Sequence, residues 1–215
     1  MAAPLLAVED VGKQYTRGLV RREITFSLAA DFVVETPAIV GVMGPNGSGK
    51  TTLFELITGS NLPSQGRVLV DGRDIHRVRY RERDRLAIHY HQSYQVRAWK
   101  KTRPSFMLDR AESDTPRIHL FDEPQFNTQD GYIGFMLQFF RRLRAQGRLV
   151  FLCLHPNESY HVDILRETCE RFIFVDRGQL THAASFDALI GDERVRTYLG
   201  ELAPQRRSRE PETRT

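Results

Sequence analysis

The sequence predicts an α/β domain of three layers, with a mostly parallel sheet at its centre and a β-rich lobe of antiparallel strands beside it. Residues 38–44 are a continuous apolar run, which is typical of a strand buried on both faces of a parallel sheet. Residues 117–124 and 148–155 are interpreted as a second and a third buried strand. Segments with helical spacing, 50–60 and 131–147, alternate with them. The β-rich lobe is predicted by residues 5–15 and 22–35, which are two alternating runs typical of antiparallel strands.

The remaining elements follow in order along the chain. Residues 16–18 are expected to turn between the first two strands, and Asp71-Gly72 to turn within a second hairpin. Residues 79–92 begin as a charged helix and end in a short strand. Gly147 closes the helix that begins near residue 131. The other expected elements are a fourth buried strand with a turn at its end in 171–180, helical patches in 185–201, and a disordered tail in 202–215. We therefore expect one domain over residues 1–201.

Composition excludes several classes of protein. The 215 residues are 40% hydrophobic and 27% charged, which is ordinary for a soluble globular domain. The net charge of +4 comes without a single-sign block, so no nucleic-acid partner is expected. The two cysteines lack the spacing of a metal or disulfide framework. No signal peptide or membrane span is recognisable, so we expect a cytoplasmic protein, held at the membrane, if at all, by a partner.

The clearest motif is GPNGSGKT at residues 44–51, which fits G-x-x-x-x-G-K-[ST] between a buried strand and a helix. Glycines allow a tight bend that points backbone N–H groups at a phosphate, and the helix N-terminus adds partial positive charge. Lys50 is expected to reach the β- and γ-phosphates of a nucleotide, and Thr51 to hold Mg²⁺. The predicted nucleotide-binding residues of this segment are Gly44, Asn46, Gly47, Ser48, Gly49, Lys50, Thr51 and Thr52.

Polar residues at other strand ends complete the predicted site. Asp122 ends a buried strand, where its carboxylate could meet the metal, and Glu123 could polarise an attacking water. His155 ends the next strand and could contact the γ-phosphate, although such a histidine could also cap a loop. Gln92 could reach Mg²⁺ or water through its amide oxygen. Tyr15 could stack on adenine, and a core or surface role fits it equally well.

This set of residues resembles the nucleotide-binding domain of ABC ATPases. The order Tyr15, GPNGSGKTT, Gln92, LFDEP and His155 carries the resemblance, which covers most of residues 5–201. Residues 167–201 are similar to the end of the ATPases of branched-chain amino-acid importers and lipopolysaccharide exporters, which often close with a YLGE helix. The resemblance implies that Gln92 is the Q-loop glutamine, Glu123 the catalytic base and His155 the switch histidine.

The chain departs from the family between Gln92 and the strand that begins near Arg117. The family carries a helical subdomain and the signature LSGGQ in this interval, whereas here only residues 93–116 fill it, without one glycine. We interpret this segment as a shortened replacement of a truncated helical subdomain. The following stretch, QFNTQD, departs from the family's usual Leu-Asp ending, since Asp130 comes one place late.

The resemblance implies a dimer in which the signature of one ATPase closes on ATP held by the other. A homodimer of this chain lacks that signature at both sites, so we expect a second, complete ABC ATPase subunit, and a membrane permease, as partners. The function predicted is the ATP-binding subunit of an ABC-type transport system that binds Mg-ATP and hydrolyses it in a heterodimer. A non-transport protein that binds ATP as a regulatory switch or scaffold, slow or inactive as an ATPase, stays open, as does a DNA-linked ATPase.

Overall fold

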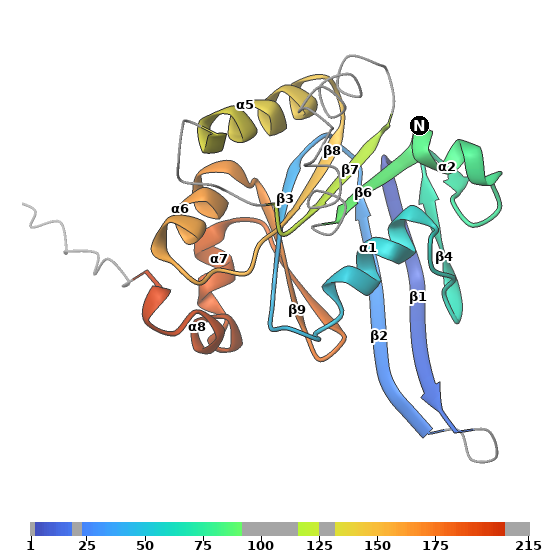
Figure 1. The fold of residues 1–215 in the computed structure, drawn as a ribbon, viewed down its shortest axis with the longest axis horizontal. Helices are drawn as coiled ribbons and strands as arrows, with labels where there is room; N and C mark the ends of the chain where they lie inside the picture. The colour runs from blue at the N-terminus through green and yellow to red at the C-terminus, as the bar shows by residue number, and fades with distance from the viewer. Residues whose placement is uncertain (1–2, 19–22, 92–115, 125–131, 205–215) are drawn as a thin grey trace, which may run out of the picture.

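The computed structural model describes residues 3–18, 23–91, 116–124 and 132–204. Within them, a four-stranded sheet lies beside a six-stranded sheet, and helices cover the latter (Figure 1). The α/β class, the mostly parallel sheet and the antiparallel lobe predicted from the sequence are confirmed. The predictions for residues 93–115, for Gln92, for QFNTQD at 125–130 and for the tail from residue 205 lie outside the described residues.

The antiparallel sheet has the strand order β2-β1-β4-β5. Its strands are β1 (Leu6–Arg17), β2 (Glu23–Val34), β4 (Gln65–Val70) and β5 (Arg73–Asp74). Strand β1 runs to Arg17, so the turn expected at 16–18 begins later; the inter-strand ladder continues because Arg17 still pairs with Glu23. Asp71 and Gly72 both have positive φ, 48° and 73°, which is the conformation of the tight hairpin turn predicted there.

The second sheet has the order β10-β9-β3-β8-β7-β6, and only β10 is antiparallel to its neighbour. Its strands are β3 (Ile39–Met43), β6 (Ala87–His91), β7 (Ile118–Asp122), β8 (Leu149–Cys153), β9 (Arg171–Asp176) and β10 (Gln179–Ala183). All five residues of each of β3, β7 and β8 are buried, as predicted for these three strands. Because the five parallel strands share one direction, their carboxyl ends meet at one edge, where ligands bind in such sheets.

Helices pack on both faces of the parallel sheet (Figure 1). They are α1 (Lys50–Thr58), α2 (Tyr80–Leu86), α5 (Tyr132–Ala145), α6 (Ser159–Thr168), α7 (Phe186–Gly191) and α8 (Glu193–Leu199), followed by a 3₁₀ turn, η1 (Gly200–Leu202). Alternate residues of a strand point to opposite faces of the sheet, so the parallel sheet has a hydrophobic core on each face. Val40 and Val42 belong to the core that includes α1 and the antiparallel sheet, whereas Ile39 and Met43 belong to the core that includes α5 to α8.

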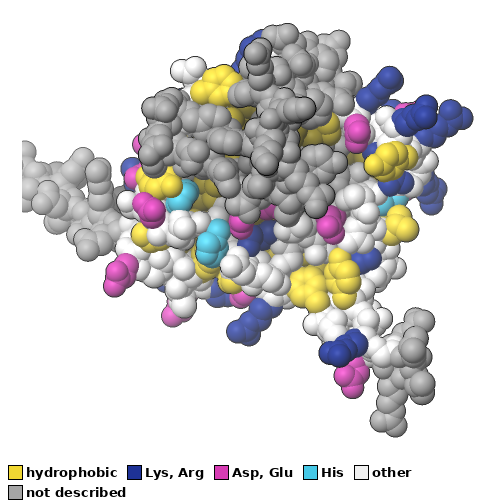
Figure 2. Space-filling view, viewed as in Figure 1, with side chains coloured by type: hydrophobic (Ala, Val, Ile, Leu, Met, Phe, Trp, Pro, Cys, Tyr) yellow, Lys and Arg dark blue, Asp and Glu magenta, His cyan; other side chains and the backbone are white. Residues whose placement is uncertain are grey.

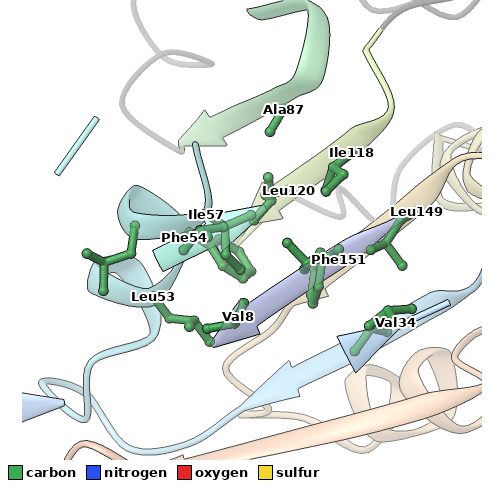
Figure 3. Packing of buried hydrophobic residues seen from close by; sticks show 14 of the residues in the cluster. Val8, Val34, Leu53, Phe54, Ile57, Ala87, Ile118, Leu120, Leu149 and Phe151 are labelled. Atoms are coloured by element: carbon green, nitrogen blue, oxygen red, sulfur yellow. The ribbon is translucent and has the colours of Figure 1, made fainter. Parts of the chain in front are cut away.

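The first of these cores fixes helix α1. Phe54 is fully buried and its ring meets that of Phe151 at 5.9 Å between centroids. Figure 3 shows Phe54 and Ile57 of α1 against Leu120 of the parallel sheet. Because the phosphate-loop motif precedes α1, this packing fixes the position of the loop relative to β7, the strand that ends at Asp122.

The surface carries charges of both signs. On the face in Figure 2 basic and acidic side chains are interspersed, and basic ones gather in the upper right, where Figure 1 places α2. None of the helices in the described ranges is both long and apolar enough to span a bilayer.

Candidate functional site

The segment 44–51 forms the loop between β3 and the N-terminus of α1, as the motif predicted. Gly47 and Gly49 have φ of 75° and 112°, a region that residues with a Cβ rarely adopt. Gly44 is required for close packing, since a Cβ there would lie 2.0 Å from the carbonyl oxygen of Val175. The N–H of Ser48 closes the bend on the carbonyl of Pro45 at 3.2 Å.

Lys50 is the first residue of α1, directly after the glycines of the loop, and is only 6% exposed. Its Nζ donates to the carbonyl oxygens of Gly44 at 2.7 Å and Pro45 at 2.9 Å. In both of these contacts the acceptor is a neutral carbonyl oxygen and not a carboxylate. Its positive charge remains available for an anion, which is what a phosphate-binding lysine needs.

Thr51 and Asp122 join the two motifs. Thr51 Oγ1 donates to Asp122 Oδ2 at 3.0 Å, across 71 residues of sequence. His89 Nε2 lies 3.3 Å from the same oxygen. Burial raises the pKa of Asp122, but hydrogen bonds from His89, Thr51 and Cys153, together with the charge of His89, outweigh burial, so this pKa lies below its ordinary value. The carboxylate is thus ionised and only 4% exposed.

Glu123 follows Asp122 with an unusual backbone. Its φ is 50°, in the left-handed region, which is costly for a non-glycine residue and common at functional sites. Its N–H donates to the carbonyl of Cys153 at 3.0 Å, continuing the ladder between β7 and β8. Asp122 therefore stays tied to Thr51 while Glu123 lines the pocket described next.

A cavity of about 490 Å³ lies against the loop. Its lining residues are Tyr15, Thr25, Phe26, Asn46, Gly47, Gly49, Lys50, Thr51, Thr52 and Glu123. Tyr15 is 37% exposed, and Asn61 Nδ2 donates to its hydroxyl oxygen at 2.7 Å. Lys13 Nζ lies 5.1 Å from the tyrosine ring centroid. The tyrosine ring is therefore held among the residues that line the cavity.

The structure brings most of the predicted site residues together. Eight of them line the cavity directly. Gly44 and Ser48 belong to the same loop, and Asp122 is tied to Thr51. His155 is not among the lining residues, and its Nδ1 instead faces the hydroxyl of Tyr198 at 3.0 Å. Gln92 lies outside the described residues.

Sequence reasoning missed three residues of the site. Phe26 and Thr25 of β2 line the cavity because Tyr15 pairs with Phe26 across the β1–β2 ladder. The alternation of β2 was visible in the sequence, but its register was not. His89 touches Asp122 because β6 pairs with β7, and no sequence signal indicated that neighbour. Long-range pairing placed each of these residues.

The polar groups at this site fit a nucleoside triphosphate with Mg²⁺. The hydroxyl Oγ of Ser48 is buried and finds no hydrogen-bond partner among the described residues, so an oxygen of a bound phosphate can satisfy it. Within the same residues, no group of three or more His, Cys, Asp or Glu side chains could hold a metal alone. Thr51 and Asp122 instead offer two oxygens, which suits Mg²⁺, an ion bound by one or two protein groups together with substrate phosphates.

Comparisons with known proteins agree with this geometry. A family model described as ABC transporter matches residues 29–113. The lipopolysaccharide export system ATP-binding protein LptB of Acidithiobacillus ferridurans is 26% identical over 92% of this chain and 97% of its own length. An uncharacterized amino-acid ABC transporter ATP-binding protein, YhdZ of Escherichia coli, is 24% identical over 94% and 96%. The dimeric ATP-binding cassette MJ0796, bound to ADP and Pi, has the same fold, with a TM-score of 0.62, 17% identity, and coverage of 83% of this chain and 98% of its own.

Proposed function

We propose that this chain, as a member of the ABC transporter ATP-binding family, is the ATP-binding subunit of a transport system and hydrolyses Mg-ATP. One observation carries the proposal. Thr51 and Asp122, from two motifs far apart in the sequence, share a hydrogen bond of 3.0 Å beside a cavity lined by the phosphate loop and Glu123. Phosphoryl transfer is catalysed by such positioning and by charge stabilisation.

Each residue takes one role in this proposal. Lys50 binds the β- and γ-phosphates in exchange for the loop carbonyls that it contacts now. Thr51 and Asp122 would hold Mg²⁺, which when bound would supply positive charge to stabilise the phosphate oxygens. Glu123 orients water, and Tyr15 stacks on the adenine. His155 contacts the γ-phosphate, and Gln92, from outside the described residues, supplies a further oxygen to metal or water.

The proposed partner is a second ABC ATPase subunit that carries the signature. This chain has no LSGGQ sequence. Its alignment with the Acidithiobacillus relative extends over 248 positions, more than the 215 residues of this chain, so that relative has segments that this chain lacks. A heterodimer then holds one complete site, built from Lys50, Asp122 and Glu123 of this chain and the signature of the partner. A membrane permease is the expected further partner, through which the subunit reaches the inner face of the membrane.

The test is a set of ATPase measurements on the complex that co-purifies with the tagged chain from its own cells. We expect Mg-dependent turnover that Glu123→Gln lowers by about 10²–10⁴-fold. Glu167→Gln, on the exposed face of α6, is the matched control and should leave turnover unchanged. The isolated chain should bind ATP and turn over slowly.

Two results would contradict the proposal. Full turnover in the Glu123→Gln complex would show that the hydrolytic site lies in the partner alone. A complex that contains neither a second ATPase nor a membrane protein would contradict the transport assignment, and would support an ATP-dependent switch or scaffold instead.

A further inference from the structure

Tyr198 of α8 reaches the phosphate site from the far end of the chain. Its hydroxyl lies 3.0 Å from His155 Nδ1, and the two rings meet edge to face with centroids 5.9 Å apart. The tyrosine ring also contacts Phe174 of β9, with centroids 5.6 Å apart. These two ring contacts help to hold the hydroxyl at His155.

The protonation state of the phenol allows it to donate in this bond. Burial raises the pKa of Tyr198 above its ordinary value, so the phenol keeps its proton. The phenol can therefore donate this proton to His155 Nδ1, which lies at hydrogen-bond distance. A neutral imidazole that accepts at Nδ1 carries its own proton on Nε2.

We propose that Tyr198 is a positioning residue that donates its hydroxyl proton to His155 Nδ1 and so fixes the ring of His155 in the Nε2–H tautomer. This inference rests on the proposed function, because a γ-phosphate contact by His155 requires a donor, and the Nε2–H tautomer provides one. Catalytic histidines depend in the same way on a neighbour that sets tautomer and orientation. Tyr198 itself touches no reacting atom.

Helix α8 is also held by contacts that do not involve Tyr198. Asp192 caps the N-terminus of this short helix, and Arg196 Nη1, from the middle of the helix, donates to the carbonyls of Ile190 and Gly191 at 2.8 Å each. Val195 and Leu199 are buried in the core that α5 to α8 form with the sheet. The helix is therefore fixed independently of Tyr198, and removal of one hydroxyl should leave it in place.

The test is nitrogen-15 NMR of the histidine rings in the full-length isolated chain at pH 8, which requires no turnover. In the wild type we expect the His155 proton on Nε2 and an Nδ1 resonance typical of a nitrogen that accepts a hydrogen bond. In Tyr198→Phe the Nδ1 resonance should move to the position of a free acceptor, whereas Tyr160→Phe, at a tyrosine stacked on His161, should leave it unchanged. A proton on Nδ1 in the wild type would overturn the inference, even if the variant did not fold.

Kinetics of the partner complex supply the second readout. Tyr198→Phe should lower kcat on the order of 10–100-fold with KM for ATP unchanged, as when the partner of a working histidine is removed. Unchanged kcat in an active complex would overturn the inference. If no complex hydrolyses ATP, the proposed function fails, while the NMR result still decides whether Tyr198 positions His155.

Discussion

Acidification below pH 6.5 should weaken the fold through His119. This residue lies in β7, three residues before Asp122, and is fully buried. Arg148 Nη1 lies 3.3 Å from its Nε2, and the Tyr90 hydroxyl lies 3.2 Å from its Nδ1. A guanidinium can only donate, so Nε2 must accept, which only a neutral imidazole can do.

The magnitude follows from the shift in pKa. Burial, and next the positive charge of Arg148, lower the pKa of His119 from 6.5 to about 3. Below pH of about 6.5 the unfolded chain therefore binds a proton that the folded chain does not bind until near pH 3. The stability contributed by the neutral ring is complete above pH 6.5 and is lost by about 1.4 kcal/mol per pH unit below it, or about 2 kcal/mol at pH 5.

Urea unfolding at pH 7.5, 6.0 and 5.0 measures this loss. His119→Gln keeps an acceptor for Arg148 and does not titrate, so its free energy of unfolding should fall by about 2 kcal/mol less than that of the wild type between pH 7.5 and 5.0. The pH profile of His182→Gln is the comparison, because burial lowers the pKa of His182 as well, but the negative charge of Asp31 opposes that shift. Parallel pH profiles for the wild type and His119→Gln would refute the reasoning.

Three further predictions follow from other contacts. Lys50→Ala should weaken ATP binding at least about tenfold in calorimetry, since a hydrogen bond to a charged group is worth about 1.5–3 kcal/mol, and unchanged affinity would contradict the phosphate-loop assignment. Phe54→Ala should lower the free energy of unfolding by about 3–5 kcal/mol in urea, and a loss below about 1 kcal/mol would show that α1 is not fixed by this ring. Gly178→Ala should destabilise the chain by more than Gly147→Ala, because a Cβ at Gly178 would lie 1.8 Å from the Ser27 carbonyl oxygen, whereas at Gly147 nothing lies within 4 Å. Both glycines have positive φ, so the cost of about 1–2 kcal/mol for that conformation is common to them, and equal losses would mean that the Ser27 contact relaxes.

Local patterns predicted the elements of this fold well. A continuous apolar run such as 149–153 must be covered on both faces, so it indicates a buried parallel strand. Asp71-Gly72 indicates its turn because both positions need positive φ. The loop at 44–51 could be predicted with its flanking strand and helix because glycine spacing and the charge of Lys50 are properties of adjacent residues.

Strand order and register could not be read in the same way. Strand β3 lies between β8 and β9, which are distant in sequence, and apolar side chains fit equally well beside other apolar strands. The contacts that depend on this order were therefore missed. They include His89 against Asp122 and, through the packing of α8, Tyr198 against His155. A lone tyrosine or histidine has no sequence signature for a partner that the tertiary fold supplies.

The parallel sheet also explains how Asp122 is positioned. Strands β6 and β7 pair in parallel register from Ala87 with Ile118 to His91 with Asp122. Parallel neighbours need a connection of a dozen or more residues to return from the end of one strand to the start of the next. Residues 92–117 separate His91 from Ile118, which is more than that minimum. Asp122 is therefore positioned by the pairing of β6, β7 and β8 and by the hydrogen bond from Thr51, all within the described residues.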